Sequence, residues 1–77
     1  MRSFSGQLLR AQRARVGLSA AQLAARVGKT KWSVWRWEQG RVQPPIPVVD
    51  AVADALGVPL DALLADDGRA VHEAVTV

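Results

Sequence analysis

The sequence predicts an all-α fold. Alanine provides thirteen of the 77 residues and aromatic residues only 5%, a composition that suits small, closely packed helices better than a sheet. Two short stretches with apolar residues at helical spacing lie between residues 18 and 40, joined by a glycine and a threonine. A chain of this length is expected to form one domain with a modest core.

The first predicted helix begins at residue 4 or 5 and runs to Val16. Leu9, Arg13 and Val16 fall on one face of it, because their spacing matches the helical repeat. An arginine on an apolar face needs a partner, since a buried unpaired charge is costly. Arg10 lies off this face and is expected in solvent or near a phosphate group.

Residues 19 to 39 predict a helix-turn-helix. Ser19 can cap the first helix of this pair, and Gln22 three residues later can complete a capping box. Gly28 is placed to end that helix, because glycine accepts the left-handed conformation that often follows a helix. Thr30 can then cap the second helix. So short a connection forces the two helices to cross at a steep angle.

The second helix of the pair, residues 31 to 39, has two distinct faces on a wheel of about 100° per residue. Val34 and Trp37 define the buried face. The opposite face carries cations, an amide and two large aromatic rings: Trp32, Arg36 and Gln39, flanked by Lys31 and Trp35. Trp37 is expected to pack in the core, whereas an exposed Trp32 indicates a contact surface.

The chain after residue 40 is expected to support the helix-turn-helix. Residues 41 to 47 contain three prolines in four positions, which exclude helix interior and strand and predict a stiffened loop. A helix that begins at Pro47 and is stopped by Gly57 follows, with an inward stripe of Val48, Val49, Val52, Ala53 and Leu56. A short fifth helix is predicted from residue 60 to about 64.

Residues 65 to 69 have the composition of a turn. For the segment after them, the sequence allows a helix, a strand or a frayed end. The predicted division is a domain of residues 1–64 and a tail of residues 65–77.

Charge is distributed unevenly along the chain. Residues 1 to 41 hold nine Lys or Arg residues against Glu38 alone, a net charge of +8. Residues 42 to 77 hold one Arg against six acidic residues, a net charge of −5. A molecule polarised in this way has a preferred side for a polyanion such as DNA, although charge alone confers no sequence preference.

Several classes of protein are disfavoured by the sequence. Cysteine is absent, which removes disulfides and thiolate metal sites. No apolar run approaches the roughly 18 residues that span a membrane. Neither a glycine-rich phosphate loop nor a catalytic constellation occurs, and His72 stands alone. We therefore expect a cytoplasmic, nucleoid-associated protein that is no enzyme and has no catalytic residue, metal, cofactor, membrane contact or small-molecule effector.

An ordered series of motifs lies between residues 17 and 58: GLS at 17 to 19, QLA at 22 to 24, Val34, WE-x-G at 37 to 40 and ALGV at 55 to 58. This series resembles the lambda repressor and Cro type of helix-turn-helix protein, often called Xre-like, and the resemblance covers roughly residues 7 to 64. The resemblance implies a compact five-helix bundle whose third helix enters the major groove of duplex DNA, usually in a transcriptional regulator. The chain departs from the family pattern at Pro59, where a Ser or Thr often caps the last helix.

Double-stranded DNA is thus the predicted partner. Base contacts are predicted for three residues of the helix 31 to 39: Lys31, Trp32 and Arg36. Backbone contacts are predicted for residues at the helix starts, on the same helix and in the proline loop: Ser19, Thr30, Trp35, Arg41 and Gln43. Because relatives often hold the first helix to the third by an ion pair, that role is carried over to Arg13 and Glu38.

A homodimer is predicted as the DNA-bound form, because one recognition helix reads only a few base pairs. The less basic half of the chain is left for the junction, with the tail as candidate dimerisation segment through Val71, Val75 and Val77.

Two functions remain open from the sequence. One is a sequence-specific DNA-binding transcriptional regulator, with repression favoured. The other is a protein-interaction module that uses Trp32 and Trp35 to hold a toxin, a sigma factor or another regulator. The charge of +8 on the helix-turn-helix half favours the first, since a pure protein binder has no need of it.

Overall fold

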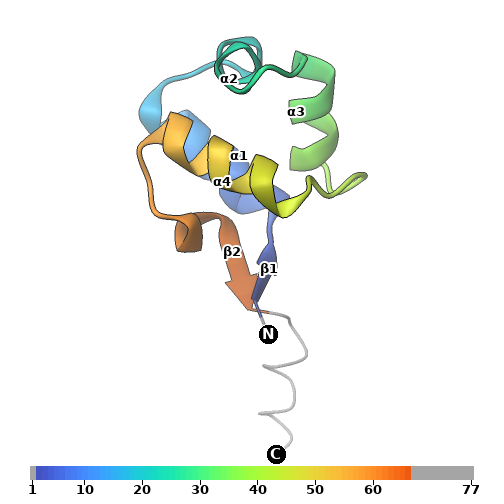
Figure 1. Ribbon diagram of the computed structural model, residues 1–77, viewed down its shortest axis with the longest axis vertical. Coiled ribbons are helices and arrows are strands. Elements are labelled where there is room, and N and C mark those ends of the chain that lie inside the picture. The colour runs from blue at the N-terminus through green and yellow to red at the C-terminus, as the bar shows by residue number, and fades with distance from the viewer. Residues whose placement is uncertain (1, 67–77) are drawn as a thin grey trace, which may run out of the picture.

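The computed structural model describes residues 2–66 of the chain. This part contains four α-helices: α1 (Gly6–Val16), α2 (Ala20–Val27), α3 (Lys31–Glu38) and α4 (Ile46–Leu56). A 3₁₀ turn, η1 (Leu60–Leu63), and two strands, β1 (Arg2–Phe4) and β2 (Leu64–Asp66), complete it. The strands lie at one end of the molecule and α2 at the other, with α1 and α4 between them (Figure 1).

One apolar core lies between the helices. Its fully buried larger side chains come from all four α-helices and from η1: Leu9, Leu23, Val34, Val49, Val52 and Leu63. Full burial of one such side chain stabilises the fold by about 1.5–3 kcal/mol. Trp37 and the α4 residues Ala53 and Leu56 are buried beside them. The predicted inward faces of α3 and α4 are therefore confirmed.

Helix α1 approaches the end of α3 more closely than a side chain would allow. A Cβ atom at Gly6 would lie 2.7 Å from the carbonyl oxygen of Glu38 and still closer to that of Trp37. The apolar face of α1 is also shorter than predicted. Leu9 is buried, but Val16, the last residue of α1 before its C-cap Gly17 (φ 82°), is 43% exposed.

A small antiparallel sheet joins the two ends of the described chain, and the sequence did not predict it. Arg2, Ser3 and Phe4 pair with Asp66, Ala65 and Leu64, respectively. Beside this ladder, the backbone N–H of Ser5 donates to the carbonyl of Leu63 at 2.9 Å. The prediction of a turn at residues 65 and 66 is therefore wrong. Strand β2 extends two residues into the predicted tail.

The prediction of a five-helix bundle is wrong in its helix count, because residues 2–66 contain four α-helices. The expected fifth helix is the 3₁₀ turn η1. Pro59 precedes this turn and supplies no side-chain cap. Leu64 follows it in an extended conformation, with φ −112° and ψ 135°, because it pairs with Phe4 in the sheet. Between the uncapped start and the strand, the chain has room for only one turn.

The proposed dimerisation residues Val71, Val75 and Val77 lie outside the described residues. Over the part of the chain that is described, no helix is long and apolar enough to cross a bilayer.

Candidate nucleic-acid interface

The helix-turn-helix is built by local hydrogen bonds. The Ser19 backbone N–H donates to Gln22 Oε1 at 2.7 Å, and the Gln22 N–H donates to Ser19 Oγ at 3.0 Å. This reciprocal cap of α2 satisfies two N–H groups that a helix start leaves free. Gly28 ends α2 with φ 72°, and Thr30 Oγ1 accepts the Ser33 N–H at the start of α3. The capping box, the glycine stop and the second cap are confirmed.

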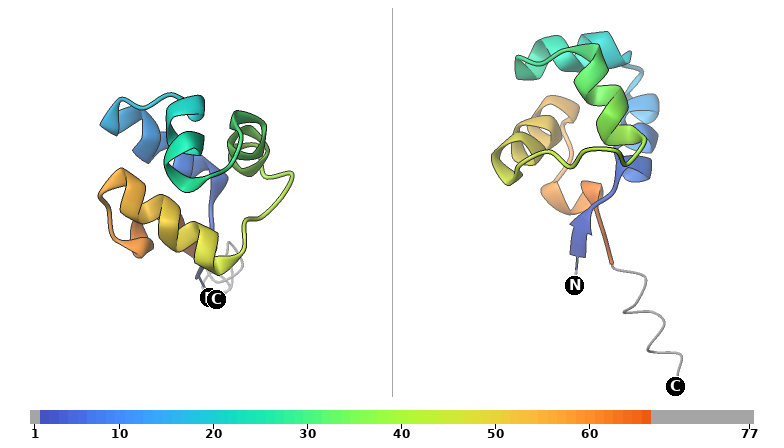
Figure 2. Two further views of the ribbon diagram at one scale, coloured as in Figure 1. Left: turned by 45° about the horizontal axis from the view of Figure 1, so that its top comes forward. Right: turned by 90° about the vertical axis from the view of Figure 1, so that its right-hand side faces the viewer.

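Helix α3 presents opposite chemistry on its two sides. Val34 and Trp37 point into the core, whereas Trp32 is 56% and Trp35 38% exposed. Lys31, Arg36 and Gln39 are exposed as well. In the right-hand view of Figure 2, α3 lies across the front of the molecule, beneath α2. A helix with cations and bare indole rings on its outer side has the composition of a contact surface.

Three of these outer side chains form a cluster. The rings of Trp32 and Trp35 meet edge to face, with centroids 5.0 Å apart and planes at 86°. The Nζ atom of Lys31 lies 5.4 Å from the Trp32 ring centroid and 5.6 Å from that of Trp35. Both distances fall within the roughly 6 Å range of a cation–π contact. We call these three residues the Lys31 cluster.

An ion pair joins α1 to the end of α3. Arg13 Nε donates to Glu38 Oε2 at 2.6 Å and Nη2 to Oε1 at 3.0 Å. The side chains are only 17% and 7% exposed, respectively. Hydrogen bonding to Glu38 raises the pKa of Arg13, against the opposing effect of burial. This contact fixes α3 against the first helix.

The loop after α3 is exposed at Arg41, Val42 and Gln43, while Pro44 is buried and anchors it. The Arg41 backbone N–H donates to the Arg36 carbonyl at 3.0 Å, across Gly40, whose φ is 76°. The last turn of α3 thus sets where Arg41 leaves the helix.

Arg10, which was expected in solvent or near a phosphate but was not counted among the site residues, borders this surface. It lines a pocket of about 240 Å³ together with Arg13, Trp35, Glu38 and Gln39. The Glu38 carboxylate in that pocket is already bound by Arg13. Arg10 forms no ion pair with any carboxylate of residues 2–66, so it adds a net positive charge to the pocket. The available signal was its position one helical turn before Arg13.

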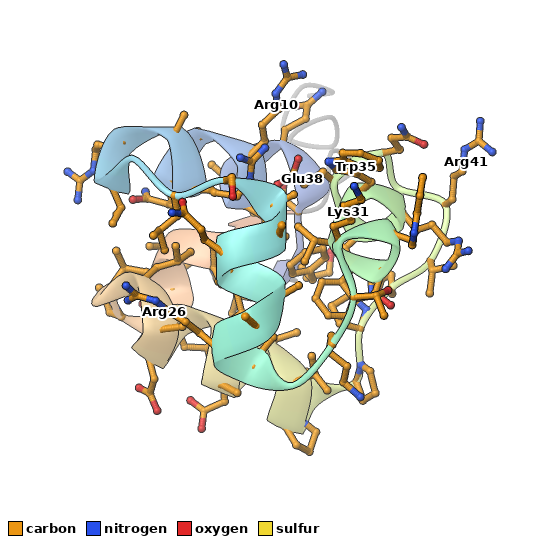
Figure 3. All side chains as sticks on the ribbon, turned by 90° about the horizontal axis from the view of Figure 1, so that it is seen from above. Arg10, Arg26, Lys31, Trp35, Glu38 and Arg41 are labelled. Atoms are coloured by element: carbon orange, nitrogen blue, oxygen red, sulfur yellow. The ribbon has the colours of Figure 1, made fainter. Side chains whose placement is uncertain are left out.

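The labelled side chains show how these groups are arranged. In Figure 3, Arg10, Lys31, Trp35 and Arg41 lie along one side of the molecule, and Arg26 lies apart from them. Arg26 Nη1 instead donates to the Ala55 carbonyl of α4 at 3.5 Å. Ser19 and Thr30 are exposed at the starts of α2 and α3, and Gln43 is exposed in the loop. Within the described residues, no three His, Cys, Asp or Glu side chains gather as metal ligands.

Comparison with known proteins identifies the architecture. The family model of the helix-turn-helix domain matches residues 6–66. The chain belongs to the lambda repressor and Xre type of helix-turn-helix family. Among solved structures, this helix-turn-helix domain is similar to the restriction-modification controller protein C.AhdI from Aeromonas hydrophila. The identity is 31%, the TM-score 0.73, and the match covers 75% of this chain and 84% of that one.

A second similar structure is the P22 c2 repressor in complex with a synthetic operator. Its identity to this chain is 28% and its TM-score 0.74, with 84% of this chain and 98% of the repressor chain covered. Hydroxypropylphosphonic acid epoxidase from S. wedmorenis also matches at 30% identity and TM-score 0.73, over 78% of this chain.

Some of these relatives are much longer than the chain. It covers 32% of the epoxidase chain. A candidate HTH-type transcriptional regulatory protein of Pyrobaculum aerophilum is 34% identical over 55 residues, which are 71% of this chain and 22% of that protein. The common part in each case is the helix-turn-helix domain.

Proposed function

We propose that this protein is a DNA-binding transcriptional regulator, a repressor, that reads the major groove of duplex DNA with α3. The observation that carries the proposal is the outer face of α3, where Lys31, Trp32 and Arg36 are exposed. The Arg36 guanidinium has no hydrogen bond or ion pair within residues 2–66. It is therefore available for bidentate pairing with guanine O6 and N7, and Trp32 for a thymine methyl or a deoxyribose.

Backbone contacts are assigned to the groups around α3. Ser19 lies at the N-terminus of α2, where the helix dipole and the first-turn N–H groups outside the capping box favour a phosphate. The others are Thr30, Trp35, Arg41 and Gln43. Contacts of this kind fix the register of the protein on the duplex but carry no sequence information.

The comparisons support this proposal. The P22 c2 repressor structure holds a synthetic operator, and C.AhdI is named as a controller protein. The net charge of +8 over residues 1 to 41 supplies the attraction for a polyanion. Binding as a homodimer to two half-sites about one helical turn apart would multiply the few base pairs read by each α3.

The decisive experiment is selection of bound sites from a random duplex pool, followed by affinity measurements on the selected site and a scrambled duplex. We expect a defined motif, a specific affinity at least about 10³-fold above that for the scrambled duplex, and an affinity that falls steeply with salt. Equal affinity for every duplex would show that the protein binds DNA without sequence specificity. The absence of binding at low salt would remove the proposal.

A protein-interaction module is the second candidate, favoured by the exposure of Trp32 and Trp35, since tryptophans are common anchors of protein interfaces. The salt dependence of binding distinguishes the DNA-binding regulator from the protein-interaction module. Capture of a specific protein that persists at high salt, without retention on duplex DNA, would support this second function.

A further inference from the structure

The Lys31 cluster is more than three neighbouring exposed residues. The Lys31 ammonium lies at nearly the same distance, 5.4 and 5.6 Å, from two indole rings that are themselves locked edge to face. A lysine on a free surface samples many rotamers on its flexible four-carbon stem. Here a single position of the ammonium makes cation–π contacts with both rings.

The helix geometry explains why these three side chains meet. Lys31 and Trp35 are four residues apart and Trp32 and Trp35 three apart, so each pair lies on neighbouring positions of the helix surface. Long side chains in a helix lean toward its N-terminus. Trp35 therefore leans over the first turn of α3, where Lys31 and Trp32 begin.

Stability of the fold does not account for a lysine at this place. Lys31 is the first residue of α3, where the helix dipole disfavours a cation, and no acidic residue in that turn offsets it. The two indole rings are exposed and stand on the side of α3 opposite its core residues Val34 and Trp37. The electron-rich ring faces are the groups that compensate the lysine charge.

We infer that Trp32 and Trp35 are positioning residues that hold the Lys31 ammonium as an oriented donor for the O6 and N7 acceptors of a guanine. The inference rests on the proposed binding of duplex DNA by α3. Restricting the lysine before binding lowers the conformational entropy lost on binding. The same restriction fixes the position of the ammonium relative to the major groove. A base pair that presents no hydrogen-bond acceptor to that position is therefore bound less tightly.

The first arm of the test uses the free protein. Proton NMR of the lysine ε-methylene groups reports ring currents, because protons over an aromatic face resonate upfield. We expect upfield-shifted Lys31 signals in the wild type and their return to ordinary positions in Trp35→Leu. Lys29 is the internal control, since it is exposed and lies over neither ring. Unshifted Lys31 signals in the wild type would overturn the inference, whatever the protein binds.

The second arm is a double-mutant cycle on the selected duplex and on a variant duplex that lacks the guanine. Lys31→Ala should lower the ratio of the two affinities by about 5- to 150-fold. Trp35→Leu should lower it by about 2- to 30-fold, the range of a cation–π contact. Trp35→Phe should restore part of that loss, because phenylalanine also presents a ring face. In the double variant Lys31→Ala/Trp35→Leu, the ratio should fall no further than in Lys31→Ala.

A matched cycle pairs Trp35→Leu with Lys29→Ala, and there the two effects should multiply. If the effects of Lys31→Ala and Trp35→Leu on this ratio also multiply, Trp35 contributes to guanine recognition independently of Lys31 and the inference is wrong. The same conclusion follows if Trp35→Leu weakens both duplexes equally. A backbone contact of Trp35 weakens both duplexes alike and therefore leaves the ratio unchanged. If the wild type binds no duplex at all while the NMR shifts are present, the proposed function fails and the positioning of Lys31 stands.

Discussion

Arg13 binds Glu38 through two of its nitrogens and, through the third, Nη1, donates to the Leu18 carbonyl at 2.9 Å. One side chain therefore fixes both the end of α3 and the turn that leads into α2. Because Glu38 raises the pKa of Arg13 above an already high ordinary value, the stability linked to this charge is fully present at neutral pH. It is lost only as the pH rises through that raised pKa.

Glu38→Ala should reduce the free energy of unfolding by about 3 kcal/mol, because it leaves the mostly buried Arg13 without its anion. Thermal melting and urea titration measure the change. Asp54→Ala is the matched control, since Asp54 is exposed on α4 and its loss should change stability by less than about 0.5 kcal/mol. A Glu38→Ala protein that melts with the wild type would show that the pair contributes nothing to the fold.

Gly6→Ala should destabilise the protein by about 1–3 kcal/mol, because the added Cβ meets the carbonyl oxygens of Trp37 and Glu38. Helix propensity alone predicts the opposite sign. Ala11→Gly, at an exposed position of the same helix, reports the propensity effect without the clash. Urea denaturation of both variants decides the matter, and a stabilised Gly6→Ala protein would mean that α1 and α3 separate readily at this point.

Arg36→Ala should weaken binding to the selected site by about 5- to 150-fold, with a much smaller effect on random DNA, if Arg36 pairs with guanine. Fluorescence anisotropy on both duplexes measures the two affinities. Circular dichroism should show an unchanged fold, because the Arg36 side chain makes no polar contact within residues 2–66. Equal losses on both duplexes would assign Arg36 to a phosphate.

Arg41→Ala should reduce affinity for all duplexes alike and lower the slope of log K against log salt by about one unit. Arg26→Ala removes the same charge from another part of the surface (Figure 3) and should leave the slope nearly unchanged. Titrations at several salt concentrations compare the two variants. Identical slopes for Arg41→Ala and the wild type would take Arg41 out of the interface.

Deletion of residues 70 to 77 should leave the domain folded, because β2 ends at Asp66. We expect the truncated protein to sediment as a monomer and to lose affinity for a palindromic site far more than for a half-site. A truncated protein that remains a dimer would shift the junction to α4 and η1.

Much of the helix-turn-helix was predictable, because its signals are local. Ser19, Gln22, Gly28 and Thr30 act within a few residues of their own positions, and the two faces of α3 follow from helical spacing. The sheet was not predictable in this way, because Phe4 and its partner Leu64 lie near opposite ends of the described chain and no single turn connects their strands. The same pairing converts the expected fifth helix into a 3₁₀ turn.

In the candidate site, too, the features set by local sequence were predictable and those set by tertiary packing were not. The sequence placed Trp32 and Trp35 on the outer face of α3, but the position of Lys31 over both rings depends on side-chain rotamers that spacing does not determine. The proximity of Arg10 to Trp35 depends on how α1 packs against α3. That packing is set by Gly6 and by the pair of Arg13 with Glu38.

The pairing of β1 with β2 has a consequence for synthesis on the ribosome. Strand β1 is synthesised about 60 residues before β2. At a translation rate of roughly 5–20 residues per second, the backbone groups of β1 therefore remain without their β2 partners for about 3 to 12 seconds. Leu63, a fully buried core residue, also arrives at the end of that interval. The nascent helices can form earlier, but a ribosome that stalls before residue 63 holds a chain whose core is still open.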